Sequence, residues 1–366
     1  MTAGLPTESL NDVTARLKST LSPSFPALLA SGGISLLVTT YQAGQLITLR
    51  HDGQGLNTHF CHFSRPMGLA ADRGRVALGC DRLIHEFYNM PSVIPRLEGP
   101  YPIQPDACYL PRQTHVTGNI DIHEMSWAGD VLWFVNTRFS CLCTLEAGYS
   151  FAPRWRPPFI SDLAAEDRCH LNGLSVVNGQ PKYVTALGAT NEPQGWRENK
   201  AHGGILMDVE TNEIICQGLS MPHSPRWYRN QLWVLESGQG SLAKVDLATG
   251  KLTTVARLPG FTRGIAFGGP LAFIGLSQIR ETSLSSGLPL TEQISERICG
   301  IWVVNIETGQ TVAHLKFQGD VREIFAVSIL AQTRYPEILR PDHDLVSTTY
   351  ALSEQSLQQV AKHLTS

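Results

Sequence analysis

The stretch "HEMSWAGDVLWF" (123–134) recurs in altered form as "HSPRWYRNQLWV" (223–234). An alignment without gaps matches His123 to His223 and places a tryptophan four residues after each histidine. Both copies join two short apolar strands through a tight turn. A unit that recurs in this way predicts a repeat architecture.

Related units run through most of the chain, about 51 residues apart on average, which is the spacing of propeller blades. Where the flanking strands are readable, each unit holds four short antiparallel strands, the content of one blade. Residues 34–63 supply three strands without an innermost one, and 320–330 supply an innermost strand without partners, so pairing them closes a ring of six blades. The six repeated segments are 64–80, 121–137, 169–186, 221–237, 261–277 and 320–330.

The pattern therefore predicts an all-β, six-bladed β-propeller with short helices at both termini. A doubly wound α/β fold is excluded because no helical pattern of 10–15 residues separates the strands. Helical spacing is confined to 9–21 and 353–366. We expect an N-terminal helical extension over 1–30, the propeller over 31–330, and a C-terminal extension with a helix over 331–366.

The composition of the chain limits the partners and the cellular compartment that we expect. The net charge of −3 and the sequence pI of about 6.5 argue against nucleic-acid binding. The first 30 residues do not resemble a secretory signal, and no apolar run is long enough to span a membrane. The eight cysteines contain no C-x-x-C pair and are typical of buried free thiols. We expect a cytoplasmic protein without membrane or nucleic-acid partners.

Three histidines point to a metal site. In a propeller, residues just before each innermost strand converge on the channel axis, so His123, His170 and His223 are expected at one mouth from three consecutive blades. Three neutral imidazoles bind zinc, iron, manganese or copper and leave coordination positions open. The sequence thus predicts a divalent transition metal as cofactor. The alternative is that these side chains satisfy backbone carbonyls.

The remaining candidates surround those histidines. The other three blades begin with Arg65, Arg263 and Arg322, whose planar forks suit the anionic group of a small substrate. Glu124 could act as a general base or complete the metal ligands. The arginines and Glu124 could instead form structural ion pairs. A long insertion, 188–202, is expected to bring Trp196 and Arg197 over the mouth as further substrate-binding residues, or to remain a solvated loop.

Short motifs resemble known propellers. "PMGLAAD" (66–72), "HLNGLSV" (170–176) and "RGIAFGG" (263–269) are similar to the strand starts of six-bladed propellers of the gluconolactonase and NHL-repeat type. The resemblance implies a metal-ligating or substrate-binding role for Asn172. His123 and His223 stand where that group has oxygen ligands for calcium. Over nearly its whole length the chain resembles a bacterial family of conserved hypothetical proteins, which implies no activity.

These observations favour a metal-dependent enzyme acting on a small anionic substrate at the channel mouth, as a hydrolase, lyase or oxygenase. Two alternatives stay open. One is a non-catalytic propeller that binds a protein or peptide on the same face. The other is a metal-free site in which a histidine acts as acid or base in a lyase or isomerase step.

Overall fold

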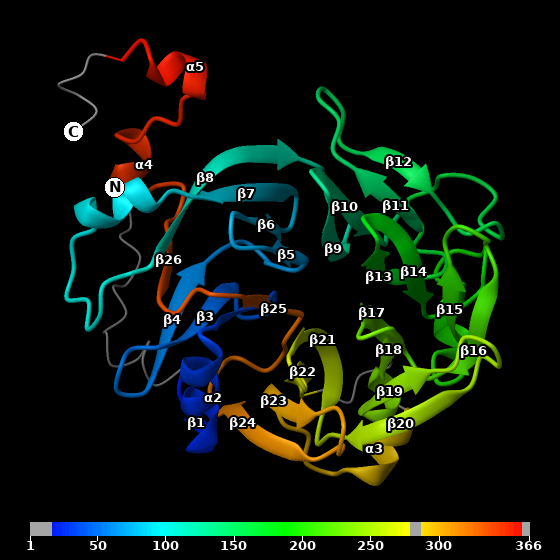
Figure 1. Cartoon of the computed structure of the whole chain (residues 1–366). Coiled ribbons are helices and arrows are strands. Elements are labelled where there is room, and N and C mark those ends of the chain that lie inside the picture. The colour runs from blue at the N-terminus through cyan, green and yellow to red at the C-terminus, as the bar shows by residue number, and fades with distance from the viewer. Residues whose placement is uncertain (1–16, 279–286, 361–366) are drawn as a thin grey trace, which may run out of the picture.

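The computed structural model describes residues 17–278 and 287–360, and it arranges six sheets around a central channel (Figure 1). The predicted six-bladed propeller is confirmed. Each sheet is one blade, and its innermost strand borders the channel. The innermost strands are β25 (Ala326–Leu330), β5 (Leu69–Ala71), β9 (Ile122–Ala128), β13 (Leu171–Val177), β17 (Pro222–Tyr228) and β21 (Phe261–Gly268).

Three further strands complete each blade in the order of the chain. The second strands are β2 (Ser35–Thr40), β6 (Arg75–Gly79), β10 (Val131–Asn136), β14 (Gln180–Ala186), β18 (Gln231–Glu236) and β22 (Leu271–Ser277). The third strands are β3 (Gln45–His51), β7 (Leu83–Asn89), β11 (Cys141–Thr144), β15 (Gly204–Asp208), β19 (Ser241–Val245) and β23 (Gly300–Asn305). The outer strands are β4 (Leu56–His62), β8 (Ala107–Val116), β12 (Ala152–Trp155), β16 (Ile214–Leu219), β20 (Leu252–Arg257) and β24 (Thr311–Phe317).

The ring closes within the first blade. β25, from near the C-terminus, pairs antiparallel with β2. Figure 1 shows the orange β25 beside the blue strands of the first blade. This is the pairing predicted from the leftover strands. It removes the open edges that an unclosed array of sheets would present.

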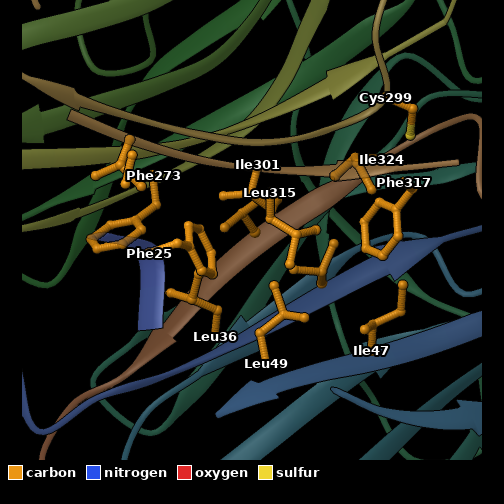
Figure 2. Packing of buried hydrophobic residues seen from close by; sticks show 14 of the residues in the cluster. Phe25, Leu36, Ile47, Leu49, Phe273, Cys299, Ile301, Leu315, Phe317 and Ile324 are labelled. Carbon is orange, nitrogen blue, oxygen red and sulfur yellow. The ribbon is translucent and has the colours of Figure 1, made fainter. Parts of the chain in front are cut away.

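The N-terminal segment differs from the expected helix over 9–21. Its described part contains strand β1 (Ser19–Leu21), which extends the sixth blade by pairing with β24. Residues 9–16 lie outside the described part. Helix α2 (Ser24–Gly32) follows and inserts Phe25 among apolar side chains of the first and sixth blades (Figure 2). The helix thus covers the seam where the ring closes.

Tight turns connect the innermost and second strands. Between β17 and β18, Arg229 and Asn230 have φ of 51° and 56°. Between β13 and β14, Asn178 and Gly179 have φ of 51° and 75°. Two consecutive residues with positive φ are typical of the type I′ turn, whose twist matches that of antiparallel strands.

A repeated hydrogen bond joins neighbouring blades. A hydroxyl at or just after the end of the second strand donates to a carbonyl at the start of the next blade's innermost strand. These bonds fix where each innermost strand begins relative to its neighbour, which positions the channel residues described below. The four pairs are Thr39 to Met67, Thr137 to Leu171, Ser237 to Thr262 and Ser277 to Ile324.

Short elements decorate the ring. Strand β26 (Pro336–Ile338) adds in parallel to β8. The proline-rich stretch before β8 forms a 3₁₀ helix, η1 (Pro91–Arg96). The C-terminal helices are α4 (Asp344–Ser347) and α5 (Glu354–Leu357), and the remaining short helices are η2 (Gly195–Asn199), η3 (Ser237–Gln239) and α3 (Pro289–Gln293). None of the helices in the described ranges has the length and apolarity needed to cross a bilayer.

Candidate functional site

The three predicted histidines meet at the end of the channel where the innermost strands begin, which we call the start mouth. The ring of His170 lies edge-on to that of His123, with centroids 4.9 Å apart. His223 lies near enough for the charge of His170 to lower its pKa further. Both His123 and His223 are 4% exposed. The structure thus brings imidazoles from three successive blades to one place.

His123 and His223 are held by the same local device. In both cases the residue two positions earlier, Asp121 or Met221, has a positive φ, of 55° or 48°. That conformation turns its carbonyl toward the Nδ1 atom of the histidine, at 2.9 Å or 3.0 Å. Non-glycine residues with positive φ carry backbone strain, which is common at functional sites.

A hydroxyl completes each device. Thr137 Oγ1 lies 2.7 Å from His123 Nδ1, and Ser237 Oγ lies 2.9 Å from His223 Nδ1. Each hydroxyl donates its own proton to the next blade, so it can only accept from the ring. Nδ1 therefore carries the hydrogen in both histidines, and Nε2 keeps its lone pair.

Burial keeps both rings neutral. Desolvation lowers the pKa of His123 and of His223 well below 6.5, and the positive charge of Arg263 lowers both further. Neutral imidazoles with a fixed tautomer act as hydrogen-bond acceptors or metal ligands through Nε2.

His170 is held differently. Its Nδ1 lies 3.0 Å from both carboxylate oxygens of Asp167, and Trp196 Nε1 donates to the same carboxylate at 3.1 Å. The Trp196 ring packs against the imidazole, with centroids 4.5 Å apart. A carboxylate behind Nδ1 fixes the orientation and the tautomer of an imidazole, as in the catalytic sites of many hydrolases. The side chain of His170 is 16% exposed and borders the solvent.

The offset of His170 in the repeat has a structural explanation. His170 itself has a positive φ, of 49°, and so occupies the position of Asp121 and Met221. Asn172, two residues later, therefore occupies the position of His123 and His223. The fourth blade thus contributes an amide at the repeat position and an imidazole beside it.

Arg263 supplies the positive charge of the start mouth. Its guanidinium stacks on the ring of Phe325, 3.7 Å from the centroid, and forms no ion pair within residues 17–278 and 287–360. Desolvation lowers its pKa, while Tyr41 and nearby carboxylates, Glu323 foremost, raise it. Burial, together with a hydrogen bond to Glu323, raises the pKa of Tyr41 to about 12. An arginine stays protonated throughout, so Arg263 is a charged donor available to an anion.

A small cavity lies among these side chains. Its volume is about 10 Å³, enough for one water-sized molecule. The Nδ2 atom of Asn172 is buried with no hydrogen-bond partner in the described structure, while its Oδ1 accepts from Thr185. The cavity lining therefore offers a free amide donor beside imidazole acceptors. The lining residues are His123, Glu124, Asn172, His223, Ser224, Arg263, Phe325 and Ala326.

Glu124 is engaged by an arginine that the sequence analysis did not single out. Its Oε1 accepts from Arg226 Nη2 at 2.5 Å, and the two side chains are 8% and 25% exposed. Glu124 therefore lines the cavity with a carboxylate that Arg226 binds.

Four of the predicted substrate-binding residues, Arg65, Arg322, Arg197 and Trp196, do not line the cavity. Arg65 is half-exposed and pairs with Asp81 at 3.7 Å, and Arg322 is exposed. Arg197 is exposed and lies 5.1 Å from the Trp196 ring. Trp196 is buried against His170, so the insertion does reach the mouth.

Sequence reasoning missed several residues of the site. Thr137 and Ser237 carried a usable signal, since each follows its histidine by the same 14 residues in the repeat. Asp167 and Tyr41 carried none, because they reach the mouth from irregular segments without repeat equivalents.

The predicted metal centre lacks a ready ligand set. Among the residues that the structure describes, no group of three or more His, Cys, Asp and Glu side chains could hold a metal ion. The fixed Nδ1 hydrogen bonds are nevertheless those that metal-ligating histidines make. The metal stays a prediction.

One known protein family matches most of the chain. The family described as "Domain of unknown function (DUF4915)" matches residues 23–339. The chain belongs to this family. The expected resemblance to a propeller family of unassigned function is confirmed. The match covers all six blades and includes His123, His170, His223 and Arg263.

One similar solved structure supports the fold, and the fold alone. A chain from the crystal structure of a nidogen/laminin complex is 9% identical with a TM-score of 0.52, and the match covers 82% of this chain and 99% of that one. A protein of unknown function from Bacteroides caccae is 10% identical with a TM-score of 0.48, over 81% of this chain and 98% of that one. No protein with a curated description matches the sequence.

Proposed function

We propose that this protein is an enzyme that hydrolyses a small organic anion at the start mouth. One observation carries the proposal: Arg263, a charged guanidinium without an ion-pair partner in the described chain, shares a water-sized cavity with two neutral imidazoles. A bound anion would balance the positive charge of Arg263. The imidazoles are acceptors suited to a water molecule.

We assign each residue a role in the proposed reaction from its charge and its surroundings. Arg263 holds the anionic group of the substrate. His123 and His223 are kept neutral by their lowered pKa values, and one of these rings accepts a hydrogen bond from the water through Nε2 while Asn172 Nδ2 donates to the water oxygen. The second hydrogen of the water is left for His170. Groups whose pKa values are driven apart commonly take different roles in one reaction.

His170 is the proposed general base. The water oxygen forms a bond to the electrophilic carbon of the substrate, and its proton passes to His170 Nε2. Asp167 stabilises the resulting imidazolium. His170 then gives the proton to the leaving group, which departs with the electron pair of the broken bond. The balance requires only water and substrate.

The test uses water labelled with oxygen-18. The chain is incubated with a panel of small carboxylates that carry ester, amide or lactone bonds, and the products are followed by mass spectrometry. We expect a product labelled by the wild type and lost in His170→Gln and Arg263→Gln. His314→Gln is the matched control, because that ring stacks on Trp302 in the outer part of the sixth blade. A product that His170→Gln still forms at the wild-type rate would refute the assignment.

A metal-dependent form of the same reaction is the second candidate. It is favoured by the three imidazoles, each of which has Nδ1 engaged and Nε2 without a protein partner in the described residues. The metal would be zinc, iron, manganese or copper. Elemental analysis of the purified chain tests it: about one transition metal per chain, lost in His123→Ala, would support this candidate, and a metal-free active enzyme would remove it.

The predicted cytoplasmic location belongs to this proposal, whereas a protein or peptide partner belongs to the alternative of a non-catalytic propeller. All eight cysteines are free and buried, as expected for a reducing compartment.

A further inference from the structure

The opposite end of the channel opens into a larger cavity, of about 550 Å³, which we call the end mouth. All six innermost strands contribute to its lining where they end. A volume of this size is within the range of small-molecule sites. The proposed reaction at the start mouth does not use it.

Arg226 is the charged group of the end mouth. Its Nη1 donates to the carbonyls of Leu174 and Pro225, and its Nη2 donates once, to Glu124. Within the described residues these bonds leave its Nε–H and one Nη2–H without an acceptor. The side chain is 25% exposed and lines the cavity. A carboxylate already binds this guanidinium from the other side, so its geometry suits that group.

The surrounding wall combines hydroxyls and aromatic rings. Ser126 and Ser328 line the cavity, and neither side chain has a hydrogen-bond partner in the described structure. Trp127, Trp227 and Phe267 also line it, and Trp127 Nε1 is buried with no partner among the described residues. The other arginine of the lining, Arg75, is occupied by Asp72 and Asp130. Arg226 is therefore the anchor left for a ligand.

We propose that the end mouth is a second binding site, for a small organic carboxylate with a flat ring. The carboxylate binds Arg226, and the ring packs against the tryptophans. Glu124 separates the two sites, since it lines the start-mouth cavity while its partner lines this one. The bound carboxylate shares Arg226 with the carboxylate of Glu124, and the two negative charges repel each other, so removing the charge of Glu124 strengthens binding.

The test titrates benzoate into the full chain and follows tryptophan fluorescence and ligand-observed NMR, with benzamide as the neutral control. Arg226→Gln should weaken benzoate binding by about tenfold or more, the factor expected for hydrogen bonds to a charged group. Glu124→Gln should strengthen it. Arg263→Gln should leave it unchanged, which separates this site from the proposed enzyme site.

Three results would overturn the proposal. The first is the absence of saturable benzoate binding to the wild type. The second is benzamide binding as tightly as benzoate, a comparison that needs no variant to fold. The third is binding that is lost in Arg263→Gln and kept in Arg226→Gln, which would place the anion at the start mouth.

Discussion

At the scale of single residues, the start mouth depends on hydrogen bonds that fix which ring nitrogen of each histidine carries the proton. Ser237 accepts from His223 Nδ1 and donates to the next blade, so one hydroxyl sets both the tautomer of the ring and the position of a neighbouring strand. The histidines were predictable because they stand at matched positions of the repeat. Asp167 was not, because an irregular segment carries it to His170 and only the folded chain shows that proximity.

The neutral histidines make stability depend on pH. Burial lowers the pKa of His223 in the folded chain below 6.5, so the unfolded chain binds more protons on acidification. The stability present above pH 6.5 is therefore lost as the pH falls toward the folded-state pKa. We expect His223→Gln to reduce this loss by about 1 kcal/mol per pH unit in that window. Urea unfolding between about pH 7 and pH 5 measures it, and equal acid losses in variant and wild type would contradict a neutral, buried imidazole.

At the scale of the elements, close contacts between innermost strands shape the channel. A Cβ atom on Gly264 would lie 2.8 Å from the backbone nitrogen of Val327 in the neighbouring blade. The positive φ of Gly264, 75°, also favours glycine. Contact and conformation together place Arg263, the preceding residue, at the channel.

Gly264→Ala should therefore cost about 3 kcal/mol or more of the free energy of unfolding. Gly269→Ala is the matched control, because Gly269 has a φ of 57° but a Cβ atom there would have no neighbouring atom within 4 Å. It should cost about 1 kcal/mol from conformation alone. Denaturant unfolding of both variants measures these costs. Equal losses of unfolding free energy in the two variants would show that the contact with Val327 is unimportant.

A buried ion pair fastens strand β26 to the ring. Arg50 Nη1 lies 2.9 Å from Glu337 Oε1, and the Arg50 guanidinium stacks 3.7 Å above the Tyr335 ring. Removing one partner of a buried pair leaves an uncompensated charge, so Glu337→Gln should cost about 3–5 kcal/mol of unfolding free energy. Asp342→Asn, in an exposed pair with Arg340, is the control and should cost nothing measurable in the same assay. Similar stability of the two variants would contradict the anchoring role.

At the scale of the whole molecule, the repeat made the fold readable. Strands, tight turns and ring closure all follow from local patterns that recur in each blade. The strand at 19–21 was not predicted because the spacing of its apolar residues fits a helix. Pairing with the edge of β24 makes the segment a strand instead. The sequence also did not predict the ion pair between Glu124 and Arg226. The two residues are 102 positions apart and meet only across the channel of the folded chain.

The same view explains why the two ends of the channel differ. The start mouth combines buried neutral imidazoles with one unpaired guanidinium in a small cavity within the described chain, whereas the end mouth is wide and lined by aromatic rings. Glu124 and Arg226 lie between them. We therefore assign chemistry to the start mouth and a second binding function to the end mouth.

Calorimetric titration of malonate into the wild type and Arg263→Gln, in buffers of different ionisation enthalpy, tests the central claim most directly. An anion beside Arg263 raises the pKa of His123 and His223, so binding should take up protons, increasingly as the pH is lowered below neutral. We predict saturable binding with proton uptake in the wild type. In Arg263→Gln we predict no proton uptake and only such binding as the end mouth supports. Equal proton uptake by both proteins, or wild-type binding without proton uptake, would contradict the account.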